Sequence, residues 1–317
     1  MAEEKSIIVK TKDSVVEAIQ GTGDVTNALL GLVSGTLVTA LKGTKLVGAE
    51  AASLVKDTIV GSVRGISEVG QEVSSAAKGV IVGVVTGTKE VAESTLDTIG
   101  KSVSMLIHTT SEVGGDLAKT ANGAMEGAIV VAKDLGVSVT DAITQASTSI
   151  IYGGKQVGSD LASTAKETII GAAQAAKEVG EKAIETISHT AGAVVKATGD
   201  LGGDMASTVK GSMVGALHGA KEIGETVLDS VAGTASAMIK STAQVGGDLA
   251  ITAKNAVEGA IEGAKEIGVD TSEAASTAAT SALKAAGDIS ADAGKQVRDA
   301  VTGTIGGVKV VLKEPFK

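Results

Sequence analysis

Apolar and polar positions recur along this chain every 11 residues, in 27 consecutive blocks from Lys10 to Gly306. Within a block, the second, fifth, sixth and ninth positions are apolar or small, whereas the third is often lysine and the fourth often acidic. Eleven residues over three turns give about 3.67 residues per turn, close to the α-helical value and far from the period of two that a strand needs. The pattern therefore predicts an all-α protein built from amphipathic helix.

A longer period lies above the 11-residue blocks. Similar segments such as Ala175-Ala-Lys-Glu-Val-Gly180 and Gly219-Ala-Lys-Glu-Ile-Gly224 begin 44 residues apart, and alternate blocks differ, which adds a weaker period of 22. Regular spacing of this kind is typical of repeat architectures rather than of one enzyme domain. We expect a helical repeat region over residues 10–306, with tails at residues 1–9 and 307–317.

The 42 glycines are the main energetic problem of a helical interpretation. Each costs about 1 kcal/mol relative to alanine inside a helix, or on the order of 30 kcal/mol if three-quarters are helical. Close approach of two helix backbones is one compensation, and glycines four residues apart favour it. The sequence predicts such packing at two sets of glycines, namely Gly79, Gly83 and Gly87, and Gly211, Gly215 and Gly219.

Other glycines resemble helix ends. A glycine stop followed by an aspartate that caps the next helix predicts hinges or turns at three sites: Gly114, Gly115 and Asp116; Gly202, Gly203 and Asp204; and Gly246, Gly247 and Asp248. Three architectures follow. One is a continuous rod of roughly 445 Å, another is a stack of helices of about 44 residues, roughly 65 Å each, and the third also turns at single glycines, with helices near 20 residues. Ala92, where equivalent blocks carry glycine, speaks against the third.

Composition narrows the function classes. Tyr152 and Phe316 are the only aromatic residues and cysteine is absent, which is unlike a globular enzyme core and removes thiolate chemistry. The net charge of −9 argues against nucleic acid. The N-terminus shows no secretory signal, so we expect a cytoplasmic protein or one exported by a non-classical route. The longest uncharged run, from Val25 to Leu41, is at the short limit for a membrane span.

Candidate chemistry is weak throughout. His108, His189 and His218 lack the spacing of helical metal ligands, and the acidic residues recur as a solvated face rather than as a distinct pair. A row of threonines at the first block position, including Thr98, Thr120 and Thr164, has the geometry of an ice-binding row only if the helix is straight. We therefore expect no catalytic residue, no cofactor, no metal and no small-molecule substrate.

The 11-residue apolar spacing resembles that of right-handed coiled-coil stalk proteins over the whole repeat region, although small residues replace large aliphatics in many blocks. Lys10-Thr-Lys-Asp-Ser-Val15 is similar to the synuclein motif, and Gly87-Thr-Lys-Glu90 resembles perilipin repeats. The first resemblance implies a long coiled coil, and the second implies an amphipathic helix on a lipid surface.

Two functions follow as expectations. The first is a non-enzymatic structural protein that self-assembles through close Gly/Ala helix packing into a fibre, stalk or sheath. The alternative is an amphipathic helical coat on a lipid droplet, granule or membrane surface. Helical content in plain buffer separates them, because a coat folds only on lipid.

Overall fold

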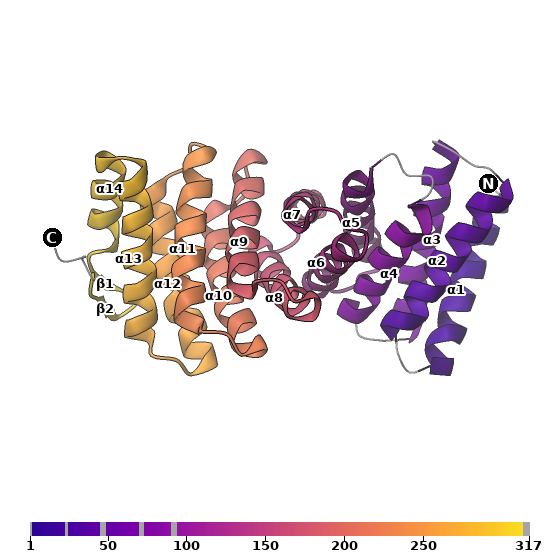
Figure 1. Ribbon diagram of the computed structural model, residues 1–317, viewed down its shortest axis with the longest axis horizontal. Helices are drawn as coiled ribbons and strands as arrows, with labels where there is room; N and C mark the ends of the chain where they lie inside the picture. The colour runs from indigo at the N-terminus through magenta and orange to yellow at the C-terminus, as the bar shows by residue number, and fades with distance from the viewer. Residues whose placement is uncertain (1, 23–24, 45–48, 70–72, 90–93, 313–317) are drawn as a thin grey trace. The chain divides into compact units, whose positions relative to one another are not determined.

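The computed structural model describes residues 2–22, 25–44, 49–69, 73–89 and 94–312 (Figure 1). Within these residues the protein is all-α apart from one short β-hairpin. The elements are α1 (Ala2–Thr22), α2 (Val25–Thr44), α3 (Ala49–Val69), α4 (Val73–Thr88), α5 (Thr95–Glu112), α6 (Leu117–Asp134), α7 (Val139–Gln156), α8 (Leu161–Val179), α9 (Ala183–Asp200), α10 (Met205–Ile223), α11 (Val227–Gln244), α12 (Leu249–Ile267), α13 (Thr271–Ile289), α14 (Ala291–Val301), β1 (Gly303–Ile305) and β2 (Val308–Val310).

The turns between helices recur every 22 residues from α5 to α13. Each contains a left-handed glycine with φ between 62° and 83°, followed two residues later by the N-cap of the next helix. At the first of these turns, Gly115 donates its N–H to the carbonyl of Thr110, and Asp116 accepts the N–H of Lys119. Glycine adopts positive φ without the steric cost of a β-carbon, so these positions end the helices. The left-handed turn glycines are Gly114, Gly136, Gly158, Gly180, Gly202, Gly224, Gly246 and Gly268.

Within each of two compact units, consecutive helices form antiparallel hairpins that stack side by side (Figure 1). Most helices make their most extensive contacts with a helix two places away, whose sequence lies 44 residues along the chain. Within a unit, the even-numbered helices therefore form one layer and the odd-numbered helices the other. Helices within a layer run parallel. Along α4, for example, Gly79, Gly83 and Gly87 lie against Leu29, Val33 and Leu37 of α2 in that order.

The chain divides into two compact units, Met1–Ser159 and Asp160–Lys317. Unit 1 stacks α2, α4 and α6 in one layer and α1, α3, α5 and α7 in the other. Unit 2 stacks α8, α10, α12 and α14 against α9, α11 and α13. Its core consists largely of alanine with a few larger side chains such as Ile169, Met213 and Met238. Small side chains fill a core to native density only when the helix axes lie close together.

The short β-hairpin follows the last helix of unit 2. Gly303, Gly306 and Gly307 have positive φ, which ends α14 and turns the chain back on itself. Strands β1 and β2 pair antiparallel, and the N–H of Val311 donates to the hydroxyl of Ser276 on α13. The hairpin thus lies against the helices rather than extending them.

These observations decide between the three predicted architectures. The helices are 11 to 21 residues long, so neither the continuous rod nor the helices of 44 residues are found. The structure has the third arrangement, with turns at single glycines such as Gly136 and Gly180 as well. Ala92, the residue that spoke against it, lies outside the described residues.

The ends of the helical region also differ from the predicted boundaries. Helix α1 begins at Ala2, so most of the predicted tail at residues 1–9 is helical. A β-carbon on Gly61 of α3 would lie 2.8 Å from the carbonyl oxygen of Ile8, which shows that this part of α1 belongs to the stack. At the other end, helix stops at Val301 and residues 303–306 belong to the β-hairpin.

Candidate interaction surface

The predicted packing glycines lie at interfaces between even-numbered helices. In unit 1, a β-carbon on Gly79 would lie 2.7 Å from the carbonyl oxygen of Thr26, a distance that real side chains do not tolerate. In unit 2, a β-carbon on Gly215 would lie 2.5 Å from the carbonyl oxygen of Lys166. Each predicted set therefore faces one neighbouring helix of the same unit: Gly79, Gly83 and Gly87 face α2, and Gly211, Gly215 and Gly219 face α8.

Some glycines of the odd-numbered helices contact side chains instead. A β-carbon on Gly153 of α7 would lie 3.2 Å from a side-chain carbon of Ile107, and one on Gly192 of α9 would lie 2.9 Å from the hydroxyl of Ser241. Side chains can rotate away, whereas a backbone carbonyl cannot. The glycine requirement is therefore strictest where a carbonyl is the neighbour, as at Gly79 and Gly215 and at Gly61 of α3.

The predicted hinge residues lie at helix ends. Gly114, Gly202 and Gly246 hold the left-handed position, and the aspartates two residues later cap the following helices. The intervening glycines, Gly115, Gly203 and Gly247, each contact the methyl group of a threonine five residues earlier. These segments are tight turns closed by backbone hydrogen bonds.

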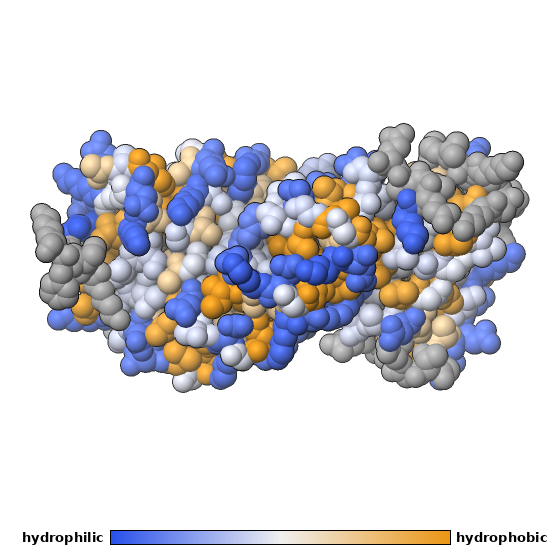
Figure 2. All heavy atoms as spheres, viewed as in Figure 1, coloured by the Kyte–Doolittle hydropathy of each residue, from blue (hydrophilic) through white to orange (hydrophobic). Residues whose placement is uncertain are grey.

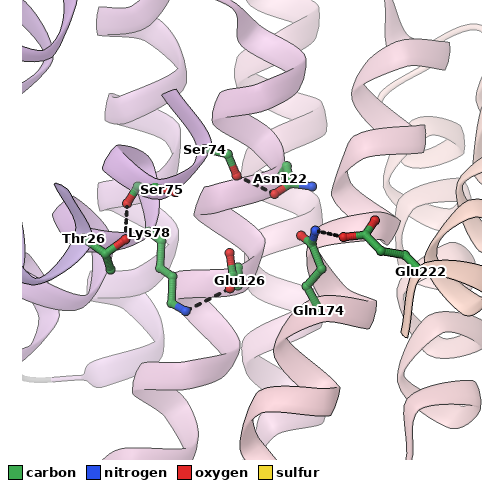
Figure 3. A network of polar contacts seen from close by, with 8 residues as sticks. All are labelled: Thr26, Ser74, Ser75, Lys78, Asn122, Glu126, Gln174 and Glu222. Carbon is green, nitrogen blue, oxygen red and sulfur yellow. Dashed lines mark hydrogen bonds and ion pairs between the residues drawn. The ribbon is translucent and has the colours of Figure 1, made fainter. Parts of the chain in front are cut away.

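A ladder of polar contacts crosses the even-numbered helices of unit 1 (Figure 3). The hydroxyl of Thr26 on α2 donates to the carbonyl of Ser75 on α4, and the hydroxyl of Ser74 donates to the side-chain oxygen of Asn122 on α6. One turn further along, the ammonium of Lys78 lies 2.8 Å from a carboxylate oxygen of Glu126, and both side chains are less than one-fifth exposed. These contacts fix the register between neighbouring helices, which rows of glycine alone would leave free to shift.

Unit 2 carries a corresponding ladder. Gln174 on α8 donates to Glu222 on α10 at 2.6 Å (Figure 3). The carboxylate of Glu266 on α12 lies 2.7 Å from Nε2 of His218 on α10 and 3.1 Å from the ammonium of Lys166 on α8. One carboxylate thus joins three helices of the same layer.

Contacts between these helices shift the pKa of two groups, Glu266 and Lys210. Partial burial raises the pKa of Glu266, but hydrogen bonds from Lys166 and His218 outweigh it and leave the pKa below its usual value. The hydrogen bond to Glu262 raises the pKa of Lys210. Both shifts mean that the charged form is stabilised by its partner, as expected for a structural ion pair.

Helix α2 presents a different face. Gly31 and Gly35 are exposed, and among the described residues no atom lies within 4 Å of a β-carbon placed on either. Asn27 and Thr39 continue the same exposed row, and the helix carries no charge from Val25 to Leu41. Gly35 is the counterpart of Gly79, 44 residues later, which packs against a neighbouring backbone. We call Asn27, Gly31, Gly35 and Thr39 the α2 face.

Helix α7 also has exposed uncharged residues four apart, namely Thr140, Thr144, Thr148 and Tyr152, but this row contains no glycine. On the side shown in Figure 2, hydrophilic residues are scattered along both units among residues of intermediate hydropathy and several groups of hydrophobic residues. Large exposed apolar side chains such as Tyr152, Ile251 and Ile289 lie on different helices. Among the described residues, no helix combines the length and hydrophobicity needed to cross a bilayer.

The other sequence candidates do not gather into a site. His108, His189 and His218 lie on α5, α9 and α10, and no cluster of histidines and carboxylates in the described part of the chain is suited to a metal ion. The threonine row is not an exposed surface, because Thr120 and Thr164 are buried and their hydroxyls donate to the carbonyls of the preceding N-cap residues. An ice-binding row is therefore wrong, since its hydroxyls are used inside the fold.

Sequence reasoning missed both the α2 face and the ladder. The ladder had a signal: four of its pairs are separated by 48 residues, one repeat plus one helical turn. The α2 face had a weaker one, the uncharged run from Val25 to Leu41, which a short membrane span would also produce.

No protein-family model matches this sequence, and no curated protein compared with it is similar. The functional argument therefore rests on the geometry of the chain.

Proposed function

We propose that this chain is a non-enzymatic structural protein that self-associates through close Gly/Ala helix packing, with the α2 face as the contact surface. The single observation that supports this most strongly is that a β-carbon on Gly31 or Gly35 would meet no described atom beyond its own helix, whereas one on Gly79 would lie 2.7 Å from a backbone carbonyl oxygen of α2. A row of small, uncharged residues is thus exposed on α2, whereas similar rows are buried between helices elsewhere in the molecule.

A second copy of the chain is the occupant that this face suits best. An uncharged, small-residue row admits a helix backbone at short distance, and a second α2 face brings the same row. A two-fold contact then pairs α2 with α2. The outer face of α14, at the end of unit 2, carries Asp292, Lys295 and Arg298 in exposed positions and does not match an uncharged helix. The pair is the first assembly step, and a fibre, stalk or sheath needs a further contact.

The repeat architecture supports a structural role independently. In this proposal two 11-residue blocks encode one helix and its turn, and the apolar stripes that resemble a coiled-coil seam join helices within the chain. Leu29, Val33 and Leu37 of α2 are buried against α4 in this way. A lipid coat would need such stripes to be free, so the amphipathic-coat alternative has less support.

Analytical ultracentrifugation of the full chain over a range of concentrations tests the proposal. We expect the wild type to sediment as a dimer or larger species. Gly35→Glu should sediment as a monomer, because it places a charge in the contact without meeting any described atom of its own chain. Gln296→Glu, on the exposed face of α14, is the matched control and should behave as the wild type does.

Two outcomes would contradict the proposal. One is a wild type that stays monomeric at every concentration, and the other is assembly that Gly35→Glu leaves unchanged. Flotation with phosphatidylcholine vesicles, together with circular dichroism without lipid, tests the coat. A chain that is unfolded in buffer and becomes helical only on vesicles would favour it.

A further inference from the structure

A cavity of about 240 Å³ lies inside unit 1, between α3, α4, α5 and α6. Its lining is mostly apolar, with Val63, Ile66, Val73 and Leu106 as the largest contributors, and none of the described residues that line it is ionisable. Val63, Ile66 and Leu106 are nearly inaccessible to solvent, whereas Ser67 is exposed and marks the mouth of the cavity. The cavity is thus apolar at its base and partly open to solvent, with Ser67, Val73 and Val113 partly or fully exposed at its rim.

The repeat shows what a filled version of this chamber looks like. Three repeats later, 132 residues along the chain, Val73 is replaced by Met205, the first residue of α10. The sulfur of Met205 lies 3.4 Å from where a β-carbon on Gly199 would be, and its methyl group lies 3.5 Å from the corresponding point on Gly247. Met205 therefore spans the space between the end of α9 and the turn before α12.

Two further differences enlarge the chamber in unit 1. Ser67 stands where unit 2 has Gly199, and the contact between α3 and α5 is much smaller than that between α9 and α11. In unit 2 a β-carbon on Gly199 would lie 2.5 Å from a methyl carbon of Val245, so a larger residue there needs that side chain or its helix to shift. Ser67 thus fits the wider spacing of α3 and α5, and Val73 is shorter than the methionine that occupies this space in unit 2.

We propose that this cavity binds a small, uncharged, mostly apolar molecule of the size of a one- or two-ring aromatic compound. Empty apolar cavities of about 150 Å³ accept benzene, so this volume is sufficient for a slightly larger compound. A lining whose described residues carry no charge selects against charged compounds, since nothing there would repay their desolvation. Among the lining residues, Ser67 carries the hydroxyl that suits a ligand with one polar atom, because the hydroxyl of Thr120 already donates to the carbonyl of Asp116.

Isothermal titration calorimetry of the full chain with indole tests this site, with benzoate as a charged compound of similar size. We expect indole to bind and benzoate to give no heat. Val73→Met, which copies the residue of unit 2, should weaken indole binding about tenfold or more by occupying the chamber. Met205→Val makes the reverse change and should add a second, weaker binding event.

Circular dichroism of both variants shows that the helices are retained, and Val73→Leu, which copies Leu117 and Leu249 of later repeats, provides a second, smaller way of filling the chamber. Absence of indole binding by the wild type up to the solubility of indole would overturn the proposal. So would undiminished binding by both folded filling variants. None of these results depends on whether the chain self-associates.

Discussion

Gly215 of α10 faces Lys166 of α8 so closely that a β-carbon on Gly215 would lie 2.5 Å from the carbonyl oxygen of Lys166. Gly215→Ala should therefore lower the free energy of unfolding by about 2 kcal/mol, because overpacking against a fixed backbone outweighs the better helix propensity of alanine. Urea denaturation at constant m-value measures the change. Gly287→Ala is the matched control in α13, where a β-carbon meets no described atom, and it should raise stability by about 0.5–1 kcal/mol. An equal effect of the two substitutions would refute the contact.

The turn glycines make a separate prediction. Gly136 has φ of 69°, and no described atom lies within 4 Å of the point that a β-carbon would occupy, so Gly136→Ala tests backbone strain alone. We expect a loss of about 1–2 kcal/mol in the free energy of unfolding. Gly136→Asn should lose less, since asparagine tolerates the left-handed region. If alanine and glycine prove equivalent in thermal unfolding, the left-handed turn is not required at this position.

The capping aspartate of α10 predicts a pH dependence. The hydroxyl of Ser207 donates to Asp204 at 2.6 Å, and with two backbone N–H groups it holds the pKa of Asp204 below its usual value. A lowered pKa in the folded state means that the stabilisation is present above the unfolded pKa and is lost as pH falls through the folded value. Asp204→Ala should cost about 1 kcal/mol at neutral pH and much less in strong acid, measured by urea denaturation. A cost that is independent of pH would assign the effect to something other than the carboxylate.

Two helices, α9 and α11, lack the side-chain cap that α8, α10 and α12 have. The N-cap of α9 is Lys182, whose side chain makes no capping hydrogen bond and instead pairs with Glu185. Lys182→Asp should raise the free energy of unfolding by about 0.5–1 kcal/mol by supplying an acceptor and a favourable charge at the helix start. Lys182→Ser separates the two contributions, because serine caps without charge. A destabilised aspartate variant would show that the Glu185 ion pair matters more than the cap.

Glu266 is predicted to contribute through two partners at once. Replacing it by glutamine removes the ionic component of its contacts with His218 and Lys166, at a cost of about 0.5–1 kcal/mol because the group is partly exposed and screened by solvent. Since the pKa of Glu266 is lowered in the folded state, the difference between wild type and Glu266→Gln should be largest above the usual carboxyl pKa and disappear as pH falls through the lowered value. Denaturation in high salt is the control, because screening should also shrink the difference. A difference that persists in acid would contradict this role.

Much of the local structure could be predicted from the sequence. The helical period, the glycine-glycine-aspartate turns and the small-residue rows are local patterns, and a residue such as Gly114 determines its own backbone conformation. The choice between rod and hairpins could not be made that way. It depends on whether Gly136 ends a helix or continues it, and a single glycine is compatible with both until its neighbours pack.

The ladder and the α2 face show the same division. The sequence contains Lys78 and Glu126, but their meeting depends on α4 and α6 lying parallel with a shift of one turn. Gly35 and Gly79 carry the same side-chain chemistry, yet one is exposed and the other is closed against a backbone. Which of the two glycines is exposed depends on whether another helix packs against it.

The sequence by itself determined the helical period, the 22- and 44-residue spacing and the capping chemistry at the turns, because each depends on interactions between residues a few positions apart. Only the tertiary structure decided which glycines face a backbone, which carboxylates join helices and where Val73 leaves a chamber that Met205 fills elsewhere. Those outcomes arise from contacts between helices 44 residues apart, where a difference of one methylene or one β-carbon sets the distance between neighbouring backbones.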